Sequence, residues 1–391
     1  MENKQETLPS ETWCVLPWQG AVIQPWGDVQ ACCYIDTVRN SNVSDYANTP
    51  ALLDLKTQLL SGQRPKACAP CWRNEAHGMP SWRQEKNDQI GDRTTLDQKS
   101  DVTYWIPDYL EIYISNKCNS KCRMCKPKWS TAWFADYEDP IVKEIFAYDA
   151  ELEAKVVRYN HLSTDQMDQI VDILSKKQTD TTLSLRGGEP FYAEECRYIM
   201  EAVLAIGKQD RVHIDISTNG TINDSSFLKL LSRFKSVKLG ISIDGSGDLN
   251  SYIRGNPTEI GQIYNNVRSY LTLDNIVNLH ISNTVQIYNA FDNIALKTQT
   301  EEHLGFLPKF DDRLLFNPRH LKLHILPEQY KQHIDNDTFK TAAFTENEDQ
   351  VLLNKWARWT NALDRLRGES IASIEPRLGT LMDMYMEKSN A

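Results

Sequence analysis

The sequence predicts an α/β protein built on an open, partial (β/α)6 TIM-like barrel. Short apolar or alternating runs that are typical of strands recur along the chain, and stretches with helical periodicity separate them. Strands that alternate with helices imply a parallel sheet connected by right-handed crossovers. We expect the six strands at residues 109–115, 182–186, 212–217, 237–243, 279–287 and 321–326.

Other elements are predicted around these strands. Two short strands flank a turn at Trp26-Gly27-Asp28, and residues 50–60 have helical character. Ser163, with Gln166 three residues on, has the capping-box arrangement that opens a helix. Residues 127–160 are an aromatic-rich insertion, which is either a lid over a site or a set of surface helices with their rings turned inward.

The chain of 391 residues is too long for one typical domain, so we divide it into three units. Residues 1–100 form a small cysteine-rich unit of hairpin and helices, with a polar linker over 84–104. Residues 101–330 form the barrel. Residues 331–391 form a helical extension whose amphipathic helix, 346–367, covers the barrel or a partner and carries no identifiable chemistry.

The composition of the chain limits the classes of function and the location that we expect. Apolar residues make up 41% of the chain, enough for a sizeable core, and the net charge of −10 makes a nucleic-acid partner unlikely. Residues 1–10 lack the apolar stretch of a secretory signal, and no apolar run is long enough to span a membrane. Nine cysteines without an export signal predict a cytoplasmic protein whose clustered thiols bind metal.

Three of the cysteines, Cys118, Cys122 and Cys125, lie on one short loop after the first expected strand. Three thiolates can hold three irons of a four-iron cube and leave the fourth iron open for another ligand. A partial zinc site or a chance grouping is the alternative that the spacing leaves open.

The tetrapeptide Gly187-Gly188-Glu189-Pro190 follows the next expected strand. Two glycines let the backbone approach a ligand closely, and a carboxylate at the carboxyl end of a strand can accept hydrogen bonds from a cationic amine. An ordinary turn is the alternative interpretation. Its position at a strand end, where such barrels place their chemistry, favours a ligand site.

A second thiol set precedes the barrel and consists of Cys14, Cys32, Cys68 and Cys71. A hairpin cysteine, an earlier cysteine and a distant C-x2-C pair form a four-thiolate set that binds zinc or an iron–sulfur cluster. The donor atoms alone do not choose between these metals, because both accept four sulfurs in a tetrahedral arrangement.

The C-x3-C-x2-C loop, Gly187–Pro190 and the segment from Ser242 to Arg254 together resemble the radical S-adenosylmethionine (SAM) enzymes. The resemblance implies a [4Fe-4S] cluster whose open iron binds the amino and carboxylate groups of SAM. It also implies that reduction cleaves SAM to methionine and a 5′-deoxyadenosyl radical. Arg254 suits the carboxylate because a guanidinium matches it. The implied SAM contacts are Met124, Gly187, Gly188, Glu189, Pro190, Ser242, Asp244 and Arg254. The family often has an aromatic residue where this chain has Met124, which alters packing around the adenine but leaves the thiol spacing intact.

The N-terminal set resembles the SPASM and twitch domains, which carry an auxiliary [4Fe-4S] cluster. In that pattern a cysteine falls five residues after the turn glycine, as Cys32 does after Gly27, so we favour Cys32 over Cys33 as the ligand. The segment from Cys71 to Gly78, followed by Ser81-Trp82-Arg83, is also similar to the tail of twitch sequences. The unit precedes the barrel here, whereas it follows the barrel in better-known members.

The resemblance implies a radical SAM enzyme that abstracts hydrogen from a peptide, a protein or a small metabolite. An electron donor such as flavodoxin or ferredoxin is the implied partner, and no catalytic residue is assigned beyond the cluster. Two alternatives stay open. One is a non-catalytic zinc-binding interaction protein with two structural cysteine sites, and the other is a degenerate relative that binds SAM without turnover.

Overall fold

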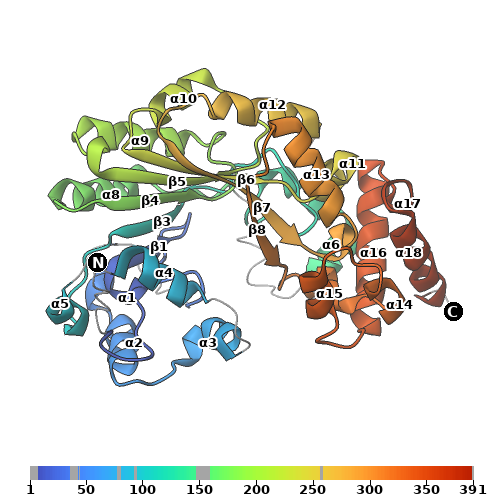
Figure 1. Ribbon diagram of the computed structural model, residues 1–391, viewed down its shortest axis with the longest axis horizontal. Coiled ribbons are helices and arrows are strands. Elements are labelled where there is room, and N and C mark those ends of the chain that lie inside the picture. The colour runs from blue at the N-terminus through green and yellow to red at the C-terminus, as the bar shows by residue number, and fades with distance from the viewer. Residues whose placement is uncertain are drawn as a thin grey trace.

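The computed structural model describes residues 8–35, 43, 45–76, 81–91, 95–146, 159–255 and 259–389. Its centre is one eight-stranded sheet in the order β2-β1-β3-β4-β5-β6-β7-β8 (Figure 1). From β3 to β8 each strand pairs in parallel with the next one along the chain, which confirms the predicted α/β class. The strands are β1 Gly20–Ile23, β2 Val29–Gln30, β3 Tyr109–Tyr113, β4 Thr181–Arg186, β5 Val212–Thr218, β6 Ser236–Ser242, β7 Ile276–Val285 and β8 Lys309–Leu314.

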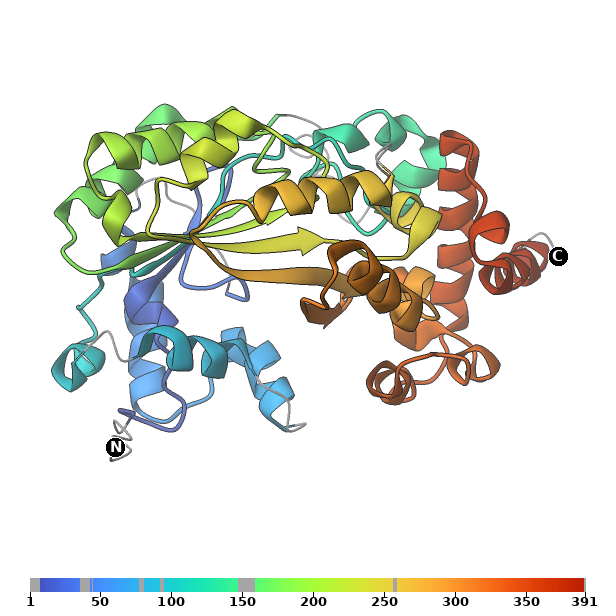
Figure 2. The ribbon, with the colours of Figure 1, turned by 45° about the horizontal axis from the view of Figure 1, so that its top comes forward.

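A layer of helices covers one face of this sheet in both ribbon views (Figures 1 and 2). Its members are α8 Thr164–Lys176, α9 Glu194–Ala205, α10 Ser225–Leu231, α12 Ile260–Tyr270 and α13 Asn293–Leu304. The predicted capping box opens α8: the Ser163 hydroxyl accepts from the Gln166 N–H, and the Gln166 side chain accepts from the Ser163 N–H. The buried face of α8 consists of Met167, Ile170, Val171 and Leu174, so its apolar spacing decides which side meets the sheet.

The predicted strand at 321–326 is wrong. These residues form two short 3-10 turns, Arg319–Leu321 and Leu323–Ile325, and their apolar side chains are buried in the C-terminal core. The sixth barrel strand is β8, whose sequence Lys-Phe-Asp-Asp-Arg-Leu is mostly charged. As an edge strand it pairs with β7 on one side only, so it needs no continuous apolar run.

The predicted linker over 84–104 is also wrong in part, because it contains helices α4 Trp82–Ile90 and α5 Leu96–Ser100. Ser81 and Gln84 form a capping box at the start of α4. Arg83 and Lys86 are buried along α4 beside Ile90. Long cationic side chains bury their stems, so a stretch of polar composition can still present a packing face.

The N-terminal unit continues the barrel sheet. β1 and β2 form the predicted antiparallel hairpin, and β1 also pairs in parallel with β3, with Gly20 opposite Tyr109 and Ile23 opposite Ile112. Three helices complete this part of the unit: α1 Leu16–Gln19, α2 Pro50–Leu60 and α3 Ala69–Ala76. Figure 1 shows them below the sheet at the left, together with α4.

The C-terminal extension is helical, as predicted. It contains α14 Glu328–Lys331, α15 Asp337–Ala343, α16 Gln350–Arg367, α17 Ile371–Ile374 and α18 Pro376–Ser389. These helices pack with α6 Pro140–Phe146 and α11 Gly247–Arg254 around a second apolar core that includes Trp133, Trp356 and Trp359. In the described part of the 127–160 insertion, Trp133, Tyr137 and Phe146 pack into or against this core, whereas Tyr159 is exposed. Residues 147–158 lie outside the described residues.

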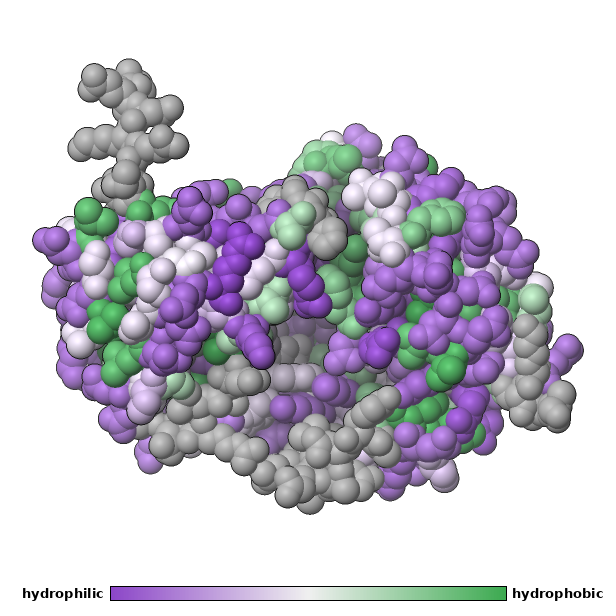
Figure 3. Space-filling view, turned by 90° about the horizontal axis from the view of Figure 1, so that it is seen from below, coloured by the Kyte–Doolittle hydropathy of each residue, from purple (hydrophilic) through white to green (hydrophobic). Residues whose placement is uncertain are grey.

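Seen from below, the surface is largely hydrophilic and is hollowed between the N-terminal unit on the left and the C-terminal helices on the right (Figure 3). Among the described helices, none combines the length and the apolar character that crossing a membrane requires.

Candidate active site

A cavity of about 240 Å³ lies at the carboxyl ends of β3 to β6. The carboxyl ends of parallel strands meet at one edge of the sheet, so polar loops that follow different strands come together there. The cavity is lined by Tyr113, Cys118, Ser120, Cys122, Cys125, Trp129, Ser130, Arg186, Gly187, Gly188, Glu189, Ser217, Thr218, Asn219, Ser242 and Arg254.

The glycine loop after β4 lies against the start of the cysteine loop. The Gly188 N–H donates to the Ser115 carbonyl at 2.7 Å, and the Glu189 N–H donates to the Lys117 carbonyl at 2.8 Å. Gly187 has φ +125°, and a Cβ on Gly188 would lie 2.3 Å from the Lys117 oxygen. Glycine is therefore required here by the close approach of two backbones.

Glu189 is 2% exposed, and three neighbouring groups donate hydrogen bonds to it. Its carboxylate accepts from the Thr218 hydroxyl at 2.6 Å, the Asn219 N–H at 2.7 Å and the Phe191 N–H at 3.1 Å. Burial raises the pKa of Glu189, while these donors act in the opposite direction. The bonds fix the orientation of the carboxylate beside the cavity and leave lone pairs for a further donor.

The cysteine loop is held by bonds to its backbone. The Arg123 N–H donates to the Ile253 carbonyl at 2.7 Å, and the Trp133 indole donates to the Cys122 carbonyl at 3.0 Å. The Ser130 hydroxyl donates to the Ser120 carbonyl at 2.6 Å. These bonds hold the loop beside the cavity, and the Cys118 sulfur itself accepts from the Ser120 N–H at 3.4 Å.

The three thiols of the loop share one environment. Burial raises the pKa of Cys118, and the neighbouring Cys122 raises it further. Burial raises the pKa of Cys125 to about 12 and raises that of Cys122 as well, which Arg254 opposes. Buried thiols that resist ionisation together become good ligands when a cation replaces their protons.

Arg254 supplies an unused donor at the cavity wall. Its Nη1 donates to Asp244 at 2.6 Å, while its Nε is buried and has no hydrogen-bond partner within the described part of the chain. Asp244 is 0% exposed, and its other oxygen accepts from the Thr284 N–H at 2.7 Å, so it orients Arg254. A buried donor without a partner costs free energy, which an anionic ligand in this cavity would recover.

Most of the predicted SAM contacts lie around the cavity, but three do not line it. Asp244 lies behind Arg254, Met124 packs against the C-terminal core, and Pro190 is buried without reaching the cavity wall. Sequence reasoning missed Thr218 and Asn219, which bind Glu189. Their signal was present, because they directly follow a predicted strand. The other lining residues not anticipated are Tyr113, Ser120, Trp129, Ser130, Arg186 and Ser217.

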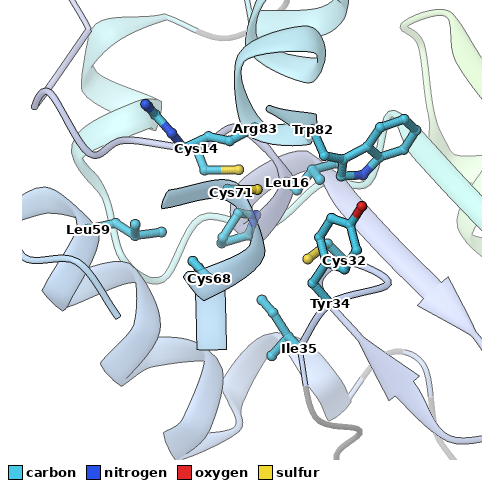
Figure 4. A pocket seen from close by; sticks show the side chains of 11 residues that line it. Cys14, Leu16, Cys32, Tyr34, Ile35, Leu59, Cys68, Cys71, Trp82 and Arg83 are labelled. Carbon is cyan, nitrogen blue, oxygen red and sulfur yellow. The ribbon is translucent and has the colours of Figure 1, made fainter. Parts of the chain in front are cut away.

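The four N-terminal thiols line a second, smaller cavity of about 20 Å³ (Figure 4). Cys14 precedes α1, Cys32 follows β2, Cys68 ends the 3-10 turn Lys66–Cys68, and Cys71 lies in α3. Burial raises the pKa of each of these four thiols. Cys33 is exposed and is absent from this cavity wall.

Arg83 closes the second cavity and ties its elements together. Its guanidinium makes two bonds to Glu75, at 3.0 and 2.8 Å, and donates to the Trp13 carbonyl at 2.8 Å. The Ser81 hydroxyl also donates to Glu75, at 2.6 Å. This ion pair joins α3 to α4, and Trp82 and Arg83 themselves line the cavity (Figure 4).

Both thiol sets line pockets instead of meeting at one point. Within the described residues, no three His, Cys, Asp or Glu side chains are gathered as the ligands of a single ion would be. Thiolates that bind different irons of one cluster do not converge on one atom. Three thiols, the orphaned Arg254 donor and the buried Glu189 acceptor around one cavity fit a cluster that holds a zwitterionic ligand.

Fold and site together define an α/β protein with a thiol-lined ligand cavity at the carboxyl edge of its sheet. Residues 112–290 match the family model of the Radical SAM superfamily, so this part of the chain, somewhat less than half of it, is a Radical SAM domain. Comparison with curated proteins gives no match.

Similarity to solved structures is low in sequence. The structure of anSMEcpe with bound AdoMet is 16% identical with a TM-score of 0.39, over 66% of this chain and 60% of that one. Streptococcus suis SuiB bound to S-adenosylmethionine is 12% identical with a TM-score of 0.39, over 86% of this chain and 73% of SuiB. SuiB bound to its precursor peptide SuiA is 11% identical with a TM-score of 0.37, over 92% and 73%. This chain thus spans about three fifths of the length of anSMEcpe.

Proposed function

We propose that the chain is a radical SAM enzyme that abstracts hydrogen from its substrate. The observation that carries this proposal is the shared cavity of the Cys118, Cys122 and Cys125 thiols with Glu189 and Arg254. These three thiols would hold a [4Fe-4S] cluster, which when bound would supply the electron for cleavage of SAM to methionine and a 5′-deoxyadenosyl radical.

The chain's own residues then have distinct tasks. The three thiolates bind the cluster, and the glycine loop brings Glu189 next to them. Glu189 accepts a hydrogen bond from the amino group of SAM, while the guanidinium of Arg254 pairs with the carboxylate of SAM. Ser242, at the end of β6, lines the cavity on the side we assign to the ribose.

We assign the second cavity to an auxiliary metal centre bound by Cys14, Cys32, Cys68 and Cys71. The resemblance to SPASM and twitch domains implies a [4Fe-4S] cluster there. Zinc is the alternative at this site, because it also accepts four sulfurs in a tetrahedral arrangement. The metal content of the protein separates the two assignments.

For the substrate we propose a peptide or protein, with a small metabolite as the second candidate. The support is the resemblance of residues 1–100 to domains of peptide-modifying enzymes. Flavodoxin or ferredoxin is the proposed electron donor, because homolysis of SAM consumes one electron from outside the chain.

Anaerobic reconstitution with iron and sulfide tests the proposal. About seven or eight irons per chain are expected with two clusters, and about four with one cluster and one zinc. Reduction with dithionite in the presence of SAM should then release 5′-deoxyadenosine, and Cys122→Ser should not. Zinc at about two per chain without iron would establish the zinc-binding interaction protein instead. Bound SAM without 5′-deoxyadenosine would establish a degenerate relative.

A further inference from the structure

The side chain of Arg123, between two cysteines of the loop, joins the C-terminal extension. It is 0% exposed, and its Nη2 donates to Asp364 at 2.6 Å and to Glu369 at 2.5 Å. Its Nε donates to the Tyr252 carbonyl at 2.9 Å, and the guanidinium lies 3.6 Å from the centre of the Tyr252 ring. Two carboxylates, 241 and 246 positions away in the chain, therefore neutralise this buried guanidinium.

A second ion pair connects the same two parts. Asp136 accepts from Lys121 of the loop at 3.0 Å and from Arg367, at the end of α16, at 2.8 Å. The guanidinium of Arg367 lies 4.8 Å from the ring centre of Trp133, whose indole binds the Cys122 carbonyl. Trp133 in turn stacks on Trp359 of α16 at 5.5 Å.

Apolar contacts also join the cysteine loop to the C-terminal part of the chain. Met124 and Cys125 both pack against the C-terminal core, so two consecutive residues of the loop rest on the extension. The loop itself contains no helix or strand. A segment without its own ladder of hydrogen bonds keeps its shape only through such outside contacts.

We propose that the C-terminal extension is the support that fixes the cysteine loop in the shape that binds its cluster. Asp364 and Glu369 are positioning residues that act through Arg123, and this inference rests on the proposed function. Losing one of its two carboxylate partners weakens the anchoring of the buried Arg123 guanidinium, so the arginine and the loop shift from their native position. The thiols on either side of Arg123 then lose their common orientation.

Thiol labelling of the full-length apoprotein tests the support without a cluster. We compare wild type with Glu369→Gln and Asp364→Asn, and measure by mass spectrometry how fast each cysteine is alkylated. Cys196, a thiol of 0% exposure in α9, reports global unfolding in the same sample. The matched control is Glu144→Gln, because Glu144 pairs with Arg358 of α16 at 2.7 Å, on the surface and away from the loop.

In Glu369→Gln and Asp364→Asn, alkylation of the three loop thiols, Cys118, Cys122 and Cys125, should be about ten-fold faster than in wild type. The alkylation rate of Cys196 in these variants, and all rates in Glu144→Gln, should equal those of wild type. After reconstitution, these variants should also lose iron to a chelator faster and show an altered electron paramagnetic resonance spectrum of the reduced cluster. Unchanged labelling of the loop thiols, or equal acceleration at Cys196, would overturn the inference. Glu369 is partly exposed, so Glu369→Gln folds even where Asp364→Asn does not. If wild type takes up no iron, the proposed function fails. The labelling of the apoprotein still tests whether the C-terminal extension fixes the shape of the cysteine loop.

Discussion

The carbonyl oxygen of Lys117 accepts a hydrogen bond from the backbone N–H of Glu189 at 2.8 Å. Lys117 directly precedes the first cysteine of the loop, and Glu189 carries the buried carboxylate of the glycine loop. Two motifs about seventy residues apart in the chain are thus one unit in space. Changes that separate their backbones should affect metal binding and SAM binding together.

Gly188→Ala should separate these backbones. The added Cβ would lie 2.3 Å from the Lys117 oxygen, far inside contact distance, so the loop must move. We expect SAM affinity, measured by calorimetry on the reconstituted protein, to fall by about ten-fold or more, with faster loss of iron. Gly261→Ala is the control, because no atom of the described residues lies within 4 Å of a Cβ at that helical position, and it should bind as wild type does. Equal affinities in the two variants would contradict this account.

Glu189→Gln should weaken SAM binding about ten- to a hundred-fold, because a neutral amide pairs less well with a cationic amine. Burial raises the pKa of Glu189, so its ionised form is lost at a higher pH than for an ordinary glutamate. SAM affinity of wild type should therefore decrease as the pH falls, and that of the variant should change less. Glu194→Gln, whose side chain is 90% exposed, is the control for a nearby charge.

Cys32→Ser and Cys33→Ser should differ sharply in metal content. Cys32 lines the N-terminal cavity, whereas its neighbour Cys33 is exposed outside it. Elemental analysis should show that Cys32→Ser loses the metal of the auxiliary site and that Cys33→Ser retains it. Equal losses, or a loss confined to Cys33→Ser, would reassign the ligand.

His320 should make the protein sensitive to acid. Burial lowers the pKa of His320 to about 3, against about 6.5 in an unfolded chain. Between these values the unfolded state binds the extra proton, so the free energy of unfolding falls as the pH falls, by about 2 kcal/mol from this group between pH 7 and 5. Urea unfolding of wild type and His320→Gln at both pH values measures the difference. The variant should lose less stability at pH 5, and an identical loss would contradict the assignment to this histidine.

Much of the site followed from local sequence, because its groups are carried by short motifs at strand ends. Gly187 to Glu189 and the cysteine loop adjoin strands that alternating residues predicted, and parallel strands bring their carboxyl ends together. The sixth strand was missed because β8 is charged, while the apolar segment 321–326 serves another core. Short apolar runs of this kind do not distinguish a strand from other buried segments.

Contacts between distant parts of the chain had no sequence signal. Nothing in the sequence around Arg123 distinguishes it from an exposed arginine, and only the fold brings it to Asp364. The pairing of β1 with β3 also had no sequence signal, because the four residues of β1 do not indicate which strand, besides β2, pairs with them. These features depend on tertiary packing, which periodicity and spacing do not encode.

The pairing of β1 with β3 also means that the cysteine-rich unit cannot be treated as a detachable module. Cutting the chain after residue 100 would strip the partner from β3 and bare an apolar strand edge, which invites self-association. Both thiol pockets are anchored to one continuous ladder of backbone hydrogen bonds. The distance between the two pockets is thus a built-in dimension of the protein, set by strand spacing instead of by a hinge.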